Sequence, residues 1–497
     1  MTADRQSANE AKISRLLLVA LLLIIAVGGT LRLAGLDADS LWLDEASSIK
    51  FAHESPAGII EETSKDVHPP LYYFALHYWM LLFGDSETSA RFLSALFGIL
   101  ALPVIYKVAT HLFDRSTGLL AAGLLALSRF HLEFSQEARM YSLLCLLGCA
   151  SVYFFLKLIE GKSRFALAGY IVTSALMMYT HVYSFFILAA ENLYWLTLLF
   201  ASRDIFQRIW KRWLVAQVTL AVLFIPWLSV QLQQFSRVQQ GFWIPKLPPR
   251  LLLYTLEMYS GSYHLAWILS ALIGLAIFSS WKGWNEAPVR KSPADDRPLL
   301  QGRLKLYLLL LWLACPILLP YIISQFSSPI FLPKYTIAAL PAFVILAARG
   351  LLSVRFHQLR MLVALLLICF SAIVLKNYFG AYKKDLWRES VAAFSQLAKP
   401  DDLVLFNDQS GIVPFEYYYR RDDLVEKPFP DYGSKLEADN LAEQLKASVE
   451  DHTRVWLVLS HPNQWTPLIP QQLARWYVAI EHIIYPGVEM YLFEKRK

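Results

Sequence analysis

Long runs of apolar residues constrain this chain more than any other feature of its sequence. Residues 304–324, and residues 209–230 after a basic start, are mostly apolar, and each run is long enough to cross a hydrocarbon core of about 30 Å as a helix. With 56% hydrophobic and 17% charged residues, the chain is too apolar for an ordinary soluble protein. The sequence therefore predicts a mainly α-helical, polytopic membrane protein.

Charged residues in the loops predict the orientation of the spans. Basic residues gather in short loops such as 203–212 and 282–305, which places these loops in the cytoplasm. Residues 35–90 instead carry ten acidic residues and two lysines, which places them outside. The amino terminus is then cytoplasmic and the carboxy terminus is extracytoplasmic, in the cell membrane (the inner membrane of a cell with two). The net charge of +6 is explained by this topology, and no nucleic-acid partner is expected.

The apolar segment 71–83 is too short to span a bilayer, and Pro69-Pro70 precedes it. A full span there would also move the basic loop 107–115 to the outside. We therefore predict an interfacial or re-entrant helix at 71–83. The first apolar run lacks a small-x-small cleavage site, so we expect it to be retained. About eleven spans are expected, at 14–34, 90–112, 117–132, 141–159, 164–182, 183–201, 212–231, 263–281, 304–324, 334–350 and 360–378.

The character of the chain changes near residue 381. Residues 402–407, 454–460 and 485–494 have the pattern of short strands, whereas 387–397, 436–449 and 470–480 have helical spacing. We predict a transmembrane domain over residues 1–380 and a small extracytoplasmic α/β domain over residues 381–497.

Polar side chains cluster in the loops that this topology places outside. Carboxylates beside a bilayer lose hydration, so such groups usually have a function. A carboxylate can accept the proton of an attacking hydroxyl, and cations can stabilise a departing phosphate. The candidates are Asp44 and Glu45 as catalytic residues, with Asp66, His68, Arg91, Glu137, Arg139, Tyr141, His181, Lys334 and Tyr335 as substrate-binding residues.

The same residues could also bind a metal ion. The carboxylates at 44, 45 and 66 would suit Mg²⁺ or Mn²⁺, and the imidazoles at 68 and 181 would also allow Zn²⁺. The spacing of these residues does not distinguish between these metals or between a metal-dependent and a metal-free reaction. A divalent cation is therefore left open, and no other cofactor is assigned. The four cysteines lie in apolar segments and show no metal-binding spacing. No GxGxxG or Walker motif is present, which argues against a nucleotide-binding domain.

Several motifs resemble the family-39 branch of the GT-C glycosyltransferases, which includes the protein O-mannosyltransferases and the lipid A aminoarabinose transferase. The matching pieces span most of residues 30–350 in family order. The resemblance implies a polyprenyl-phosphate sugar donor, inversion at the anomeric carbon, Asp44 as the base, and a protein, lipid or glycan acceptor. Lys334 departs from the family, in which an arginine is expected. The pieces are LWLDE (41–45), DVHPPLYY (66–73), ARFLSALFG (90–98), QEARMYSL (136–143), YTH (179–181) and KY (334–335).

Structural explanations compete with these functional ones. Asp66 and His68 could only cap the helix that follows Pro70, and Arg139 could be an interfacial anchor. Arg32, near the end of the first span, is expected to be an interfacial cation.

Two other functions compete with glycosyl transfer. A transporter or lipid flippase could use the same carboxylates for coupling, although no inverted repeat is evident. An inactive relative that acts as a binding scaffold is a third alternative.

Overall fold

The computed structural model describes residues 2–161, 163, 165–241, 244–245, 248–281, 302–381, 384–430 and 439–496. Most of the loop 282–305 therefore lies outside the described residues. The chain divides into two compact units, which we describe separately. The first comprises residues 1–34, 55–83 and 90–380, and the second comprises residues 35–54, 84–89 and 381–497.

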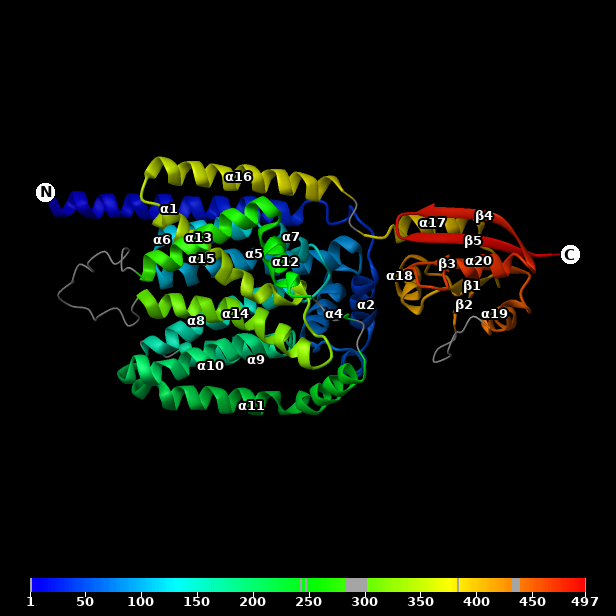
Figure 1. The fold of residues 1–497 in the computed structure, drawn as a ribbon, viewed down its shortest axis with the longest axis horizontal. Helices are drawn as coiled ribbons and strands as arrows, with labels where there is room; N and C mark the ends of the chain where they lie inside the picture. The colour runs from blue at the N-terminus through cyan, green and yellow to red at the C-terminus, as the bar shows by residue number, and fades with distance from the viewer. Residues whose placement is uncertain are drawn as a thin grey trace. The chain divides into compact units, whose positions relative to one another are not determined.

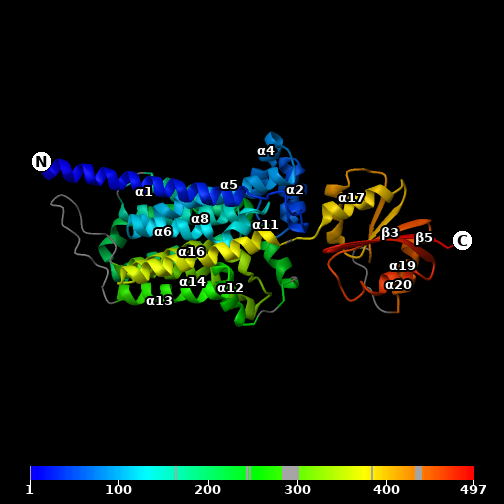
Figure 2. The same cartoon turned by 90° about the horizontal axis from the view of Figure 1, so that it is seen from above.

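The first unit is a bundle of long apolar helices that run side by side (Figures 1 and 2). Among the described residues, nine helical segments are long and apolar enough to span a membrane, which confirms a multi-pass, mainly helical fold. The nine are α1 (Ser14–Leu33 of the helix Thr2–Leu33), α5 (Glu87–Leu112), α8 (Tyr141–Glu160), α10 (Ser184–Ala201), α11 (Arg203–Gln240), α13 (Tyr263–Trp281), α14 (Gly302–Phe326), η1 with α15 (Pro333–Ser353) and α16 (His357–Gly380).

Three apolar helices are shorter, with 13 residues each: α4 (Leu71–Phe83), α6 (Arg115–Leu127) and α9 (Ala166–Met178). A helix of that length is about 20 Å long, which is less than the thickness of a hydrocarbon core. The helix α4 matches the expected short segment. The helices α6 and α9 occupy the expected spans 117–132 and 164–182 but are shorter than predicted. The other short helices of this unit are α3 (Pro56–Lys65), α7 (Arg129–Ser135) and α12 (Arg250–Ser260).

Arg32 corrects one prediction. Its side chain is fully buried, so it is not an interfacial cation. The guanidinium donates to the carbonyl oxygens of Leu125 and Ala126 at 3.0 and 3.2 Å, and it lies 2.8 Å from Nδ1 of His131. These carbonyl oxygens lie in the last turn of helix α6, where no following turn supplies N–H donors, and that of Leu125 also accepts from the N–H of Ser128 at 3.3 Å. Arg32 therefore joins the end of α1 to the end of α6.

Gly350 in α15 lets two helices approach each other closely. A Cβ atom at this position would lie 1.9 Å from the backbone oxygen of Leu272 in α13. Backbone atoms cannot yield as a flexible side chain can, so Gly350→Ala should destabilise the unit by about 3 kcal/mol. Thermal unfolding in detergent should show a clear fall in Tm. The control is Gly274→Ala, because nothing lies within 4 Å of its Cβ position; a similar fall there would contradict the interpretation.

The second unit contains a five-stranded sheet with the order β2-β1-β3-β5-β4. The first three of these strands are parallel and the last two pairings are antiparallel. The strands are β1 (Leu403–Phe406), β2 (Val425–Pro428), β3 (Arg454–Leu459), β4 (Tyr477–Tyr485) and β5 (Val488–Lys495). The helices are α2 (Leu43–His53), α17 (Trp387–Leu397), α18 (Ile412–Tyr418), α19 (Leu441–Val449) and α20 (Leu468–Leu473), with a short turn η2 (Gln409–Gly411).

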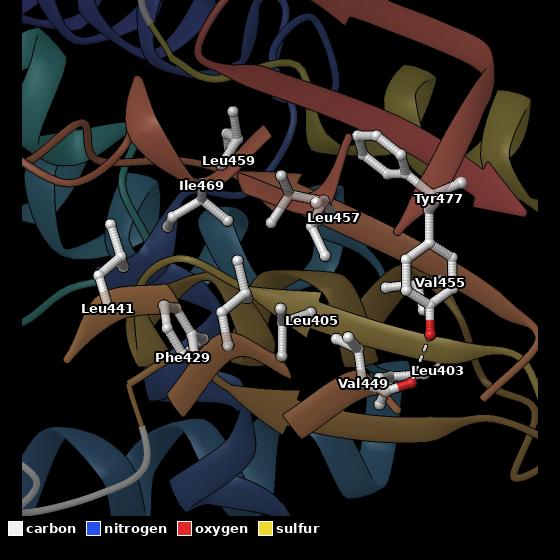
Figure 3. Packing of buried hydrophobic residues seen from close by; sticks show 13 residues of the cluster. Leu403, Leu405, Phe429, Leu441, Val449, Val455, Leu457, Leu459, Ile469 and Tyr477 are labelled. Carbon is white, nitrogen blue, oxygen red and sulfur yellow. Dashed lines mark hydrogen bonds between the residues drawn. The ribbon is translucent and has the colours of Figure 1, made fainter. Parts of the chain in front are cut away.

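Alternate residues of the central strands pack on opposite faces of the sheet. Leu403, Leu405 and Leu457 pack on one face with residues of α19 and α20, as Figure 3 shows. Val404 and Trp456 pack on the other face with residues of α17 and α18. Because both faces are covered, the parallel strands are apolar throughout. This arrangement confirms the expected α/β character.

One stretch of this unit was predicted wrongly. Residues 470–480 were expected to be a helix, but α20 ends at Leu473 and β4 begins at Tyr477. Tyr477 donates its hydroxyl hydrogen to the backbone oxygen of Val449 at 2.5 Å (Figure 3). The residues of β4 are mostly exposed because it lies at the edge of the sheet, so the strand lacks an apolar alternation that could mark it. The edge strand β2 was not anticipated either.

Candidate active site

The candidate residues fall into both units. Asp44 and Glu45 belong to the second unit. The first unit holds the substrate-binding candidates, at positions 66, 68, 91, 137, 139, 141, 181, 334 and 335.

Two histidines and a tyrosine from three separate turns meet in the first unit. The ring centroids of His68 and His181 are 4.9 Å apart, and Tyr335 lies 6.0 Å from the first and 5.0 Å from the second. Tyr141, at the start of α8, stacks beside Tyr335 at 6.1 Å. Tyr183 completes the group, 5.5 Å from both Tyr335 and His181. Turns separated by more than 250 residues thus form one aromatic cluster.

Backbone hydrogen bonds fix the histidines in place. The N–H of Leu71, at the start of α4, donates to the carbonyl oxygen of Tyr179 at 3.0 Å and so joins the His68 turn to the His181 turn. The N–H of Tyr183 donates to Nδ1 of His181 at 3.1 Å. A neutral imidazole that accepts at Nδ1 carries its proton on Nε2. That Nε2 atom is buried and has no hydrogen-bond partner among the described residues, so it can donate to a ligand.

Two cations approach the same cluster. Nζ of Lys334 lies 5.7 Å from the ring centroid of Tyr141 and 5.8 Å from that of Tyr335. Arg139 is 5% exposed, and its Nη1 lies 3.4 Å from the hydroxyl of Tyr73 in α4. The carbonyl of Arg139 accepts a hydrogen bond of 3.0 Å from Ser94 in α5. The structure therefore buries Arg139 within the protein, which differs from the alternative of an interfacial anchor.

The turn that carries Arg139 is held by Gln136. Its side-chain nitrogen donates to the carbonyl oxygens of Leu31, Arg32 and Ala34, at 3.2, 3.2 and 2.7 Å, and so caps the end of α1. The 3₁₀ helix η1 (Pro333–Ala339), which carries Lys334, is anchored by Tyr259 in α12. The hydroxyl of Tyr259 donates to the backbone oxygen of Thr336 at 2.7 Å. Hydrogen bonds therefore hold the backbone of both segments, the one that carries Arg139 and the one that carries Lys334.

Burial and positive charge keep both histidines neutral. Burial, together with the charges of Arg139 and Lys334, lowers the pKa of His181 to about 3. Burial, His181 and the same two cations hold the pKa of His68 well below its usual range. Both cations are therefore close enough to the two rings to act on them. The site brings two cations and a neutral N–H donor to one cluster, which suits an anion.

This electrostatic arrangement predicts acid sensitivity. In the unfolded chain His181 binds a proton near pH 6.5, whereas in the fold it stays neutral down to about pH 3. The unfolded state therefore binds more protons below pH 6.5, and stability falls with falling pH by up to about 1.4 kcal/mol per unit. We expect Tm to fall between pH 6.5 and 4.5 and to fall less steeply in His181→Asn, whose side-chain oxygen can still accept from Tyr183. Equal slopes in the two proteins would contradict this.

Asp44 and Glu45 lie in the first turn of α2, where the helix dipole favours negative charge. Asp44 is half-buried, whereas Glu45 is fully buried and pairs with Lys384 at 2.7 Å between Nζ and Oε2. The structure thus gives the two neighbours different surroundings. Glu45 has a structural partner that the sequence did not indicate.

The remaining candidates lie in or next to helices of the first unit. Asp66 is half-buried and is the C-cap residue of α3. Arg91 is buried in α5, and Glu137 is buried in the turn before α8. Among the described residues, no group of three or more His, Cys, Asp or Glu side chains is arranged to hold a metal ion.

Two residues of the cluster were not selected from the sequence. Tyr183 could have been found from the sequence, because it follows His181 by two residues. In the structure its hydroxyl donates to the backbone oxygen of Ile330 at 2.9 Å, just before η1. Tyr73 lies in the segment 66–73 and could have been found in the same way.

Comparison with known proteins supports the motif-based resemblance. Residues 67–229 match the family model described as dolichyl-phosphate-mannose-protein mannosyltransferase. A search of curated protein sequences found no match.

The fold is similar to that of solved glycosyltransferases. ArnT from Cupriavidus metallidurans in the apo state has a TM-score of 0.63 and 13% identity, over 95% of this chain and 97% of that chain. ArnT bound to undecaprenyl phosphate has a TM-score of 0.60 and 14% identity over the same shares. The Archaeoglobus fulgidus oligosaccharyltransferase tethered to an acceptor peptide has a TM-score of 0.56 and 11% identity, over 97% of this chain and 74% of that chain.

At such identities the structural likeness establishes the fold, and the family match covers residues 67–229. The resemblance inferred from the motifs is therefore confirmed. This chain has the fold of the GT-C membrane glycosyltransferases, and its residues 67–229 match the mannosyltransferase family model.

Proposed function

We propose that this protein transfers a sugar from a polyprenyl-phosphate donor to a hydroxyl group of a protein, lipid or glycan acceptor, with inversion, at the extracytoplasmic face of the membrane. The observation that carries the proposal is the cluster of Arg139, Lys334, His68 and His181, which is positively charged and contains a buried N–H donor. The structure of ArnT with undecaprenyl phosphate supports a lipid-phosphate donor.

The phosphate of the donor binds between the two cations. The guanidinium of Arg139 and the ammonium of Lys334 stabilise the negative charge that grows on the phosphate as the sugar leaves. Nε2–H of His181 donates a hydrogen bond to a phosphate oxygen. Lys334 acts as a point charge, because it lacks the forked geometry that an arginine would supply.

Asp44 acts as the general base. The acceptor hydroxyl attacks the anomeric carbon, and its oxygen forms the new bond to the sugar. The bond between that carbon and the phosphate oxygen breaks, and polyprenyl phosphate leaves with the electron pair. The proton of the hydroxyl passes to the Asp44 carboxylate. Attack from the side opposite the phosphate inverts the anomeric configuration.

A deletion experiment tests the proposed function and identifies the substrates. Glycans, lipids and proteins of cells with and without this gene are compared by mass spectrometry. We expect one sugar decoration to disappear and to return when the wild-type gene is restored. An unchanged set of glycans would contradict the proposal, and proton-coupled flux of a substrate into vesicles without any glycosyl product would favour a transporter instead.

A further inference from the structure

The second unit joins two short segments of the amino-terminal part of the chain to the C-terminal sheet. Residues 35–54, which contain α2, and residues 84–89 form this unit together with residues 381–497. Lys384, α17 and α18 contact these segments at several points. We infer that the C-terminal domain positions α2, and with it Asp44, for catalysis. This inference rests on the proposed role of Asp44 as the base.

The buried ion pair between Glu45 and Lys384 is the strongest of these contacts. The side chain of Glu45 is fully buried, that of Lys384 is 12% exposed, and their charged atoms lie 2.7 Å apart. Breaking such a pair leaves one buried charge without compensation, which is strongly unfavourable. Since Glu45 follows Asp44 in the same helical turn, the ion pair also restrains the Asp44 backbone.

The segment that carries Lys384 is attached to the sheet at the turn between β4 and β5. The N–H of Leu386 donates to the carbonyl oxygen of Pro486 at 2.9 Å, in the turn between β4 and β5. The next residue, Gly487, has a φ of +83°, and a Cβ there would lie 2.0 Å from Oδ1 of Asp385. The segment 384–386 therefore packs closely against this turn, and Lys384 is held at a defined place.

Helix α17 contacts the segment that precedes α2. Ser40 donates to Oε2 of Glu389 at 2.9 Å, and its Oγ accepts from the N–H of Arg388 at 3.1 Å. The guanidinium of Arg388 donates to the backbone oxygen of Asp37 at 3.0 Å and pairs with Glu87 at 2.6 Å. One helix end thus binds both amino-terminal segments.

Helix α18 packs against α2 itself. The hydroxyl of Tyr418 accepts from the N–H of Leu41 at 2.7 Å and donates to Glu87. Glu416 pairs with Lys50 in the last turn of α2 at 2.8 Å. The pair of Lys50 and Glu416 is exposed and contributes little by itself, but the bond to Leu41 fixes the backbone just before α2 begins.

These contacts support a positioning role. A domain that only recognised an acceptor would not require a buried ion pair to the residue beside the base. Lys384 touches Glu45 and acts on Asp44 through the backbone, so it is a positioning residue. A displacement of about 1 Å in a reacting group can reduce turnover on the order of 100-fold.

The test uses the full-length protein in detergent with Lys384→Met, which keeps the length of the side chain but removes its charge. We expect kcat for transfer from a polyprenyl-phosphate sugar to fall on the order of 100-fold, with KM for the donor unchanged. Hydrogen–deuterium exchange should become faster at the amides of α2. Lys384→Arg keeps the charge and should restore most of the activity and the protection. The control is Arg421→Gln, because Arg421 pairs with its near neighbour Asp423 and should affect neither measurement.

The outcomes separate this inference from the proposed function. Wild-type kcat and unchanged exchange at α2 in Lys384→Met would overturn the inference, and so would a loss of activity without faster exchange at α2. If Asp44→Asn retains full turnover, the proposed base is wrong. Faster exchange at α2 in Lys384→Met would still show that the C-terminal domain holds this helix.

Discussion

Replacing Asp44 by Asn should abolish nearly all turnover while leaving the fold intact. The substitution keeps the size of the side chain and removes only its capacity to accept a proton. Since general bases contribute factors of about 10² to 10⁴, we expect kcat to fall about 10³-fold. Transfer of a labelled sugar from a polyprenyl-phosphate donor measures this directly.

The control for Asp44 is Glu61→Gln. Glu61 is an exposed carboxylate of the same acidic segment 35–90 and pairs with Lys65 one turn along α3. Its replacement should leave turnover unchanged. A turnover of Asp44→Asn close to the wild-type value would remove Asp44 from the mechanism, whatever the other residues do.

Arg139 should carry the second large effect. Its guanidinium is buried beside the two histidines, so Arg139→Met removes one of two charges available for the leaving phosphate. We expect kcat/KM to fall about 10²- to 10³-fold, as when one donor to a developing oxyanion is removed. Affinity for polyprenyl phosphate, measured by native mass spectrometry, should also weaken. Asp44→Asn should not weaken that affinity, which separates the base from the phosphate site.

Arg129→Gln is the matched control for Arg139. Arg129 is an arginine at the start of α7, the helix that precedes the Arg139 turn. It is 45% exposed and lies 3.7 Å from Glu133. Its loss should change neither turnover nor affinity. If Arg139→Met bound polyprenyl phosphate as tightly as the wild type, the assignment of the phosphate site to this cluster would be wrong.

The helical membrane fold was predictable because a membrane-spanning helix requires a long run of apolar residues, which can be read directly from the sequence. A helix in lipid needs apolar side chains on its outer face, so runs such as 304–324 were identified without knowledge of any contact. The spans predicted at 117–132 and 164–182 are longer than α6 and α9, because hydropathy does not show where a helix ends. Arg32 was misjudged because hydropathy cannot show that carbonyl oxygens from another helix surround a charge.

The candidate site was predictable only in part. His68, His181 and Lys334 were selected because they are polar residues in loops that the charge pattern predicts to lie outside, and the structure brings their turns together. The partnership of Glu45 and Lys384 could not be foreseen. These residues are 339 positions apart, and neither local spacing nor periodicity connects them. The positioning role that we infer for the C-terminal domain rests on such long-range contacts, which the sequence alone does not indicate.

The most direct test of glycosyl transfer follows both products of the reaction. The purified protein is reconstituted in vesicles that contain a polyprenyl-phosphate sugar labelled in the sugar, and a membrane extract supplies acceptors. We predict that the label moves to an acceptor and that polyprenyl phosphate is released in equal amount, and that neither occurs with Asp44→Asn. Labelled donor that crosses the bilayer chemically unchanged, with no released polyprenyl phosphate, would contradict the account and indicate a flippase.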